Sequence, residues 1–313
     1  MNSPRRVLVL AAASLAVACS ESRMSSNVDE ASSSDALEVQ NGVANNGISN
    51  NGLASNGISN NGISNNGISN NGLATWGLYW GPDQAAFANW YHANPAYADM
   101  VMTYAVRCAL YDGDWAYFWD PWTGVEHWYW GKLGLAPDWG YGPPSEFDEQ
   151  MVSACMGALS NKFGEHVSVS LQGRNEYNEW IPLAYNELTS YSFREGCFFG
   201  NFFRGQGVYA GLDHGPIPAN TSSVRACALD QAANGTSTAC PPIVQVGSCS
   251  TYCTPAGANA YAWCTYGGRT YPAVTTRLKP ATLSTCGDGV CSVSEKCGTS
   301  SSAKACVDCG ACK

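Results

Sequence analysis

The stretch SEFDEQMVSACMGALSNKFGEHVSVSLQG, residues 145–173, predicts a helix followed directly by a strand. Ser145 is a good N-cap residue, and Asp148 places negative charge in the first helical turn. Apolar residues then recur at intervals of three and four, the period of an amphipathic helix, until Gly164. The alternation of apolar and polar residues in 166–173 predicts a strand with one buried face.

A second helix is predicted upstream, within ANPAYADMVMTYAVRCAL, residues 93–110. Asn94 can cap it, and the proline that follows suits a first helical turn. Cys108 lies on the apolar face of this helix, and Cys155 lies on the apolar face of the helix that starts at Ser145. One hypothesis is therefore that a disulfide joins the two helices.

The segment between these helices, WAYFWDPWTGVEHWYW, residues 115–130, predicts a β-hairpin because strand-like alternation flanks a turn sequence with Pro and Gly. Downstream, SYSFREGCFFGNFF, residues 190–203, predicts a strand in which Gly196 and Gly200 mark bulges or close backbone approach. Helices and strands are thus intermingled, and we expect a single disulfide-stabilised α+β body at 76–280.

The chain contains 15 cysteines, an odd number. Without Cys19 there remain an even set in the body and an even set in the C-terminal tail, so every other cysteine can pair. The spacing does not determine which pairs form. The disulfide candidates are Cys108, Cys155, Cys197, Cys227, Cys240, Cys249, Cys253, Cys264, Cys286, Cys291, Cys297, Cys306, Cys309 and Cys312.

The N-terminus has the pattern of an export signal at 1–18, with two arginines before a short apolar run. Small residues before Cys19 resemble a bacterial lipobox, which predicts a lipid on Cys19. The alternative is ordinary cleavage and a soluble secreted protein. Ser20 favours the outer membrane or cell surface, and the polar, serine-rich segment 19–40 predicts a lipid-anchored flexible linker.

Residues 41–75 form seven near-identical five-residue units, such as NGISN. One aliphatic residue every five positions makes no stripe on a helix and alternates between the two faces of a strand. The units resemble pentapeptide repeats, whose family forms a squared coil, although Asn and Gly precede the aliphatic residue here. We expect a spacer, with an extended segment and a short coil as the two alternatives.

Four motifs, VRCAL, GKLGLAPDW, VSACMGALSNKFGEHVSVSLQG and REGCFFGNFF, occur in this order. They resemble a family of uncharacterised exported bacterial proteins, many of them predicted lipoproteins. The tail at 281–313, which contains CGDGVC, is similar to a cysteine-rich module that ends many large secreted bacterial proteins. The resemblance implies export and a disulfide-rich body, but it implies no reaction.

The aromatic hairpin is the candidate binding surface, because flat indole rings can stack on the faces of sugars. The other interpretation, which the usual role of aromatic residues favours, is that these side chains pack into a core or cover a sheet. Charged residues make up only 13% of the chain and the net charge is −9, which argues against a nucleic-acid partner. The candidate ligand-binding residues are Trp115, Tyr117, Trp119, Trp122, Trp128 and Trp130.

The favoured function is therefore non-catalytic binding at the cell surface, with a glycan or an envelope polymer as partner. The alternative is an extracellular hydrolase that uses Glu195, or Asp213 with His214, for acid–base chemistry. Glu195 could instead form an internal salt bridge with Arg194 or Arg204. No metal-ligand motif is recognised, and no cofactor is expected, although acidic residues of the tail could hold calcium.

Overall fold

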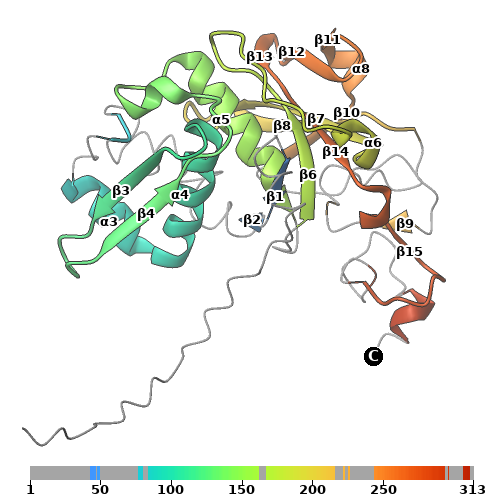
Figure 1. Ribbon diagram of the computed structural model, residues 1–313, viewed down its shortest axis with the longest axis horizontal. Coiled ribbons are helices and arrows are strands. Elements are labelled where there is room, and N and C mark those ends of the chain that lie inside the picture. The colour runs from blue at the N-terminus through green and yellow to red at the C-terminus, as the bar shows by residue number, and fades with distance from the viewer. Residues whose placement is uncertain are drawn as a thin grey trace, which may run out of the picture.

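The computed structural model describes residues 43–46, 48–49, 77–79, 84–161, 167–215, 221–222, 225, 243–292, 295 and 306–310. Its helices and mixed sheets confirm the predicted α+β class (Figure 1). The signal sequence, Cys19, the linker and most of the repeat lie outside the described residues, as do Cys227, Cys240, Cys297 and Cys312. No helix in the described ranges is long and apolar enough to cross a membrane.

The described helices include three of two turns or more and two single turns. The helices are α3 (Gln84–Ala93), α4 (Pro95–Ala109), α5 (Glu146–Leu159), α6 (Glu187–Ser190) and α8 (Cys249–Tyr252). The strands are β1 (Val43–Asn46), β2 (Ile48–Ser49), β3 (Trp115–Trp119), β4 (Glu126–Trp130), β5 (Ser160–Asn161), β6 (Val167–Gln172), β7 (Phe193–Asn201), β8 (Gly207–Leu212), β9 (Thr221–Ser222), β10 (Ile243–Ser248), β11 (Cys253–Ala256), β12 (Ala260–Tyr266), β13 (Arg269–Pro272), β14 (Val274–Leu278) and β15 (Ser284–Thr285).

The central sheet has six strands in the order β1-β6-β14-β7-β8-β10. Its pairs are antiparallel except for β8 with β10, which are parallel. The outermost strand β1 consists of the last three residues of the first repeat unit and the first residue of the second. The predicted spacer at 41–75 is therefore not wholly separate from the body, because its first unit completes the main sheet.

Helix α5 packs against the central sheet and is almost entirely buried. Its start matches the prediction: Ser145 and Asp148 form a capping box, in which each side chain accepts a hydrogen bond from the other residue's backbone N–H. It ends at Leu159, five residues before the predicted stop at Gly164. The next residues leave the helix because they form β5, which pairs with β2 from the second repeat unit.

Strand β7 runs through both glycines, and both of them allow close backbone approach, as predicted. A Cβ on Gly196 would lie 2.4 Å from the carbonyl oxygen of Gly211 on the neighbouring strand. Gly200 has φ +133°, and a Cβ there would lie 2.3 Å from the carbonyl oxygen of Gly207. The pairing of β7 with β14 also skips Glu195, so the strand has a bulge at this residue.

Five disulfides are present within the described residues. The pair Cys108–Cys155 joins α4 to α5 and confirms the hypothesis drawn from the two apolar helix faces. The remaining bridges are Cys197–Cys249, Cys253–Cys264, Cys286–Cys306 and Cys291–Cys309. Disulfides persist mainly in oxidising compartments, so this set indicates an exported protein.

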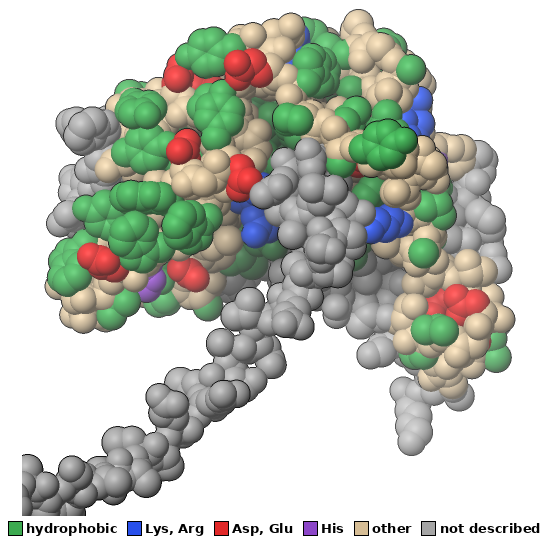
Figure 2. Space-filling model, viewed as in Figure 1, with side chains coloured by type: hydrophobic (Ala, Val, Ile, Leu, Met, Phe, Trp, Pro, Cys, Tyr) green, Lys and Arg blue, Asp and Glu red, His purple; other side chains and the backbone are tan. Residues whose placement is uncertain are grey.

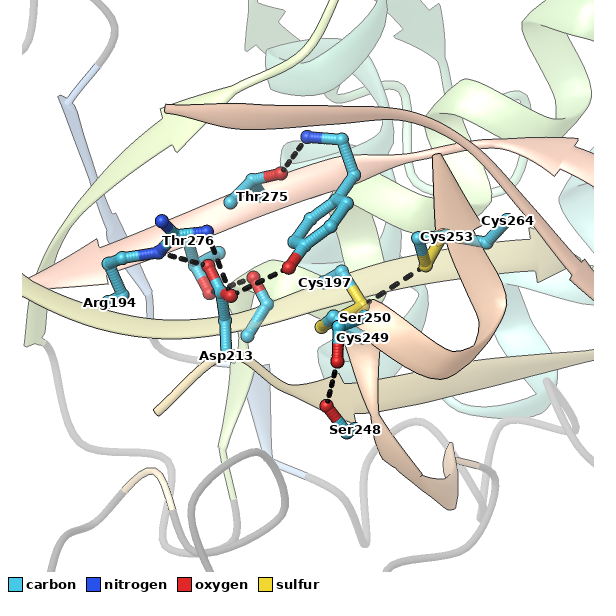
Figure 3. Close-up of a disulfide and its surroundings, with 12 residues drawn as sticks. Arg194, Cys197, Asp213, Ser248, Cys249, Ser250, Cys253, Cys264, Thr275 and Thr276 are labelled. Atoms are coloured by element: carbon cyan, nitrogen blue, oxygen red, sulfur yellow. Dashed lines mark hydrogen bonds and ion pairs between the residues drawn. A yellow bond between two sulfur atoms is a disulfide. The ribbon is translucent and has the colours of Figure 1, made fainter. Parts of the chain in front are cut away.

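Two of these bridges lie side by side in a second core, which β7, α8 and the strands β11, β12 and β13 form together (Figure 3). The sulfur atoms of Cys197 and Cys253 are 3.5 Å apart. Gly211 leaves room for them, because a Cβ there would lie 2.8 Å from the Cys197 sulfur. Cys197–Cys249 joins β7 of the central sheet to α8, and Cys253–Cys264 joins β11 to β12 within the three-stranded sheet β11-β12-β13, which packs on the central sheet through the same core.

Candidate aromatic binding face

The hairpin of β3 and β4 has one apolar face that packs on helices and one aromatic face that is open to solvent. Trp115 pairs with Trp130, and Tyr117 pairs with Trp128, directly across the two strands. Their side chains are exposed, as is that of Trp119, which faces Glu126 in the register. The alternation along both strands places all of them on one side of the hairpin. For these residues, the alternative of a buried aromatic core is wrong.

Exposure of this set is high for large apolar side chains. The exposed fractions lie between 39% for Trp115 and 60% for Trp130. In Figure 2 these side chains form a continuous hydrophobic patch over β3 and β4, with acidic side chains beside it. A continuous exposed apolar patch of this kind usually marks an interaction site.

Three rings in the middle of the face contact one another. The ring centroids of Trp115 and Trp128 are 4.8 Å apart, and those of Tyr117 and Trp128 are 5.5 Å apart. Tyr117 and Trp128 are stacked with an angle of 26° between their planes, whereas Trp115 is tilted by 57° against Trp128. These mutual contacts restrict the rings in the absence of any ligand, so the face is largely preorganised.

The opposite side of the hairpin packs into the large hydrophobic core that also contains residues of α3 and α4. Phe118 is buried and contacts Phe87 of α3, with 4.4 Å between ring centroids. Tyr129 is also buried, and its hydroxyl donates a hydrogen bond of 3.0 Å to Asp99 of α4. Burial, together with the charge of Asp99, raises the pKa of Tyr129 well above its ordinary value, so the hydroxyl keeps its proton.

Asp120 organises the turn at the hairpin tip. Its carboxylate accepts hydrogen bonds from the Trp122 backbone N–H at 2.9 Å and from the Thr123 hydroxyl at 2.5 Å. It also lies 2.9 Å from Nε2 of His92 on α3. Burial raises the pKa of Asp120, but these hydrogen bonds and His92 outweigh it and hold the pKa below its ordinary range. The tip is therefore attached to α3.

Trp122 is a ligand-binding candidate that the structure places apart from the aromatic face. Its ring stacks on the His92 ring, with 4.1 Å between centroids and 7° between planes. It lies in the turn and remains 61% exposed. Trp122 thus belongs to the tip that fixes the hairpin on α3.

Glu195 is fully buried, and its carboxylate is closed off by an arginine. Arg225 donates hydrogen bonds of 2.7 Å and 2.8 Å to the two oxygens of Glu195. It also donates to the carbonyl oxygens of Ala158 and Ser160 at the end of α5. The expected internal salt bridge is present, but its partner is Arg225 and not Arg194 or Arg204. The sequence pattern could not predict this pair, because Arg225 and Glu195 are 30 residues apart along the chain.

Asp213 and His214 do not form a catalytic pair in the described structure. Asp213 accepts two hydrogen bonds from Arg194, at 2.6 Å and 2.9 Å, and one from the Tyr261 hydroxyl at 2.8 Å (Figure 3). Nδ1 of His214 lies 2.7 Å from the carbonyl oxygen of Gly215. A backbone hydrogen bond joins Asp213 to Glu195, but their carboxylates have different partners. Arg194 and Tyr261 donate to Asp213, whereas Arg225 donates to Glu195.

A shallow cavity of about 430 Å³ lies between the segment 180–183 and the turn 256–260. No carboxylate, histidine or cysteine lines it, so it brings no acid–base groups together. In the tail, Asp288, Glu295 and Asp308 each accept a backbone N–H hydrogen bond. These carboxylates thus stabilise turns of the tail, and in the described residues they do not form a common ligand set.

Two features of the surface were missed by the sequence reasoning. Glu126 lies on the aromatic face and accepts a hydrogen bond of 3.2 Å from the Trp128 indole N–H. The strict alternation of 126–130 could have indicated this position. Trp263 is a separate exposed tryptophan, which contacts Phe147 and Arg174 far from the hairpin sequence. Only tertiary structure brings these three residues together.

The fold is that of a disulfide-stabilised α+β protein, and its disulfides indicate export. Comparison of the chain with protein-family models, with curated proteins and with solved structures found no match.

Proposed function

We propose that this protein is a non-catalytic binding protein of the cell surface, and that its aromatic face binds a glycan of the envelope or its surroundings. The observation that carries the proposal is the row of exposed, mutually restrained rings on β3 and β4. Trp115 and Trp119 lie four residues apart on one strand, which corresponds to roughly 13 Å along the face. A surface of this length can accommodate a short run of sugar rings.

The chemistry of the face supports a sugar ligand. The electron-rich faces of indole and phenol rings attract the polarised C–H groups on the flat side of a pyranose. Glu126 adds a hydrogen-bond acceptor for sugar hydroxyls at the end of the row near Trp119. The outward positions of the two strands carry no Lys or Arg, so an uncharged or cationic glycan fits better than an anionic one.

The binding proposal is tested with the full-length protein on a glycan array, followed by calorimetry with the best ligand. We expect Trp128→Ala to lower affinity on the order of tenfold or more, because it removes the ring at the centre of the cluster. Trp263→Ala is the matched control, since it removes an exposed indole elsewhere and is expected to leave affinity unchanged. Equal effects of both substitutions, or no glycan bound by the wild type, would overturn the proposal.

The hydrolase alternative is examined with the same protein on a panel of glycan and peptide substrates. The proposal expects no turnover. Turnover that is abolished by Glu195→Gln in a protein that still folds would establish the alternative instead, and binding would then be a step of catalysis.

We also propose that Cys19 carries the lipid that holds the protein on the membrane. The support is the small-residue pattern before Cys19 and the even number of cysteines that remain without it. In bacteria that express the full chain, Cys19→Ser is expected to move the protein from the membrane fraction to the soluble exported fraction. Intact mass measurement should then show the loss of the acyl groups. An unchanged mass and an unchanged membrane fraction would refute lipidation.

A further inference from the structure

The edge strand β1 of the central sheet is formed by residues of the repeat. Strand β1 pairs antiparallel with β6, and Val43, Ala44, Asn45 and Asn46 lie opposite Ser170, Val169, Ser168 and Val167. On its other side β6 pairs with β14, so without β1 the edge of β6 would be open. Residues 43–46 of the repeat therefore occupy a strand-binding edge of the folded body.

The sequence of β1 recurs along the chain. The four residues of β1 are Val-Ala-Asn-Asn, and the windows that start at 48, 58, 63 and 68 all read Ile-Ser-Asn-Asn. A shift of an ordinary strand by an odd number of residues turns its buried side chains outward. Here a shift to any of these four windows returns an aliphatic residue, a small residue and two asparagines to the same four places opposite β6.

The contacts that hold such a strand depend little on the unit chosen. The ladder of an added strand consists of backbone hydrogen bonds, which every unit can make. The side chains at the first two places differ only between Val, Ile and Leu and between Ala and Ser. Repetitive polar strands have weakly specified register for this reason.

We infer that the edge of β6 binds a repeat unit of this chain without selecting one particular unit. Several units of the same chain can therefore occupy this edge, one at a time. A unit of the same chain is the occupant because it is tethered to the edge, whereas a second copy must be recruited from solution. Each shift by one unit adds five residues to the chain that precedes the body. In extended conformation this is about 17 Å of reach. The repeat then acts as an adjustable tether, whatever ligand the aromatic face binds.

The test uses proline, which removes a backbone donor and fixes φ at about −65°, whereas an antiparallel strand needs a φ of about −140°. Ala44→Pro disables the first unit alone. A second variant carries proline at the equivalent place of every unit, and a third is the same except that Ser64 is kept. The equivalent places are Ala44, Ser49, Ala54, Ser59, Ser64, Ser69 and Ala74.

Hydrogen exchange of the β6 amides, at 167–172, reports whether the edge is covered. We expect protection to persist in Ala44→Pro, to fall in the variant with all seven prolines, and to return when Ser64 alone is kept. Native mass spectrometry of each variant identifies the source of the strand, which should be the same monomer.

Three outcomes would overturn the inference. Loss of protection in Ala44→Pro would show that only the first unit fits. Unchanged protection with all seven prolines would show that no repeat strand covers β6. Protection that returns only in a dimer would show that a second copy, and not the same chain, supplies the strand.

Discussion

The buried pair of Arg225 and Glu195 gives a prediction whose size follows from its geometry. Both side chains are completely buried, and the guanidinium holds both carboxylate oxygens. Removal of one member of such a pair leaves an uncompensated buried charge, which costs ~3–5 kcal/mol. Arg225→Met also leaves the carbonyl oxygens of Ala158 and Ser160 without this donor. We therefore expect the free energy of unfolding to fall by about 4 kcal/mol or more.

The assay is equilibrium unfolding in guanidinium chloride with the disulfides intact. The double variant Arg225→Met with Glu195→Met should recover most of the loss, because replacing both charges removes the desolvation penalty as well. Glu146→Gln is the control: its pair with Arg204 joins side chains that are 52% and 46% exposed, and its loss should cost less than ~1 kcal/mol. A loss below ~1 kcal/mol for Arg225→Met, or a double variant no more stable than the single one, would refute the reasoning.

Three further predictions concern stability. Replacement of Cys108 and Cys155 by Ser removes a bridge across a separation of 47 residues and should lower the unfolding free energy by about 4 kcal/mol, as measured by denaturant unfolding. The lowered pKa of Asp120 means that its stabilising contribution is present above the ordinary pKa of an Asp and is lost as pH falls toward the folded-state value. Asp120→Asn should accordingly flatten the acid side of the plot of melting temperature against pH, and an unchanged slope would contradict this. Burial, against the hydrogen bonds from Ser145, raises the pKa of Asp148, so its charge destabilises the fold at neutral pH and this penalty fades as pH falls. Asp148→Asn keeps an acceptor for the cap and should raise the melting temperature at pH 7, whereas a decrease would show that the charge is needed at the helix N-terminus.

Local sequence patterns predicted the elements well where one period dominates. The helix that starts at Ser145 and the hairpin at 115–130 were located from apolar spacing and turn residues alone. The bridge between Cys108 and Cys155 could be proposed because both cysteines fall on apolar helix faces. Hairpin alternation also indicated which aromatics share a face, although it did not indicate that this face is the open one.

Contacts between distant segments could not be read in the same way. The sequence offered Arg194 and Arg204 as partners of Glu195, yet the chain returns and buries Arg225 there. The pairing of repeat residues 43–46 with β6 was missed as well. A polar pattern with a period of five residues does not indicate which strand the repeat pairs with.

For this protein, the amino-acid sequence by itself determined the export signal pattern, the even cysteine sets, the α+β class and the aromatic hairpin, since each of these depends on neighbours along the chain. Only the tertiary structure decided that the aromatic rings face solvent and that repeat residues 43–46 form a strand of the central sheet. It also decided that the two candidate carboxylates pair with different arginines, Asp213 with Arg194 and Glu195 with Arg225. The physical reason is that burial and pairing depend on segments that meet only in the fold, and in a chain of this length many partners compete for each charge and each sheet edge.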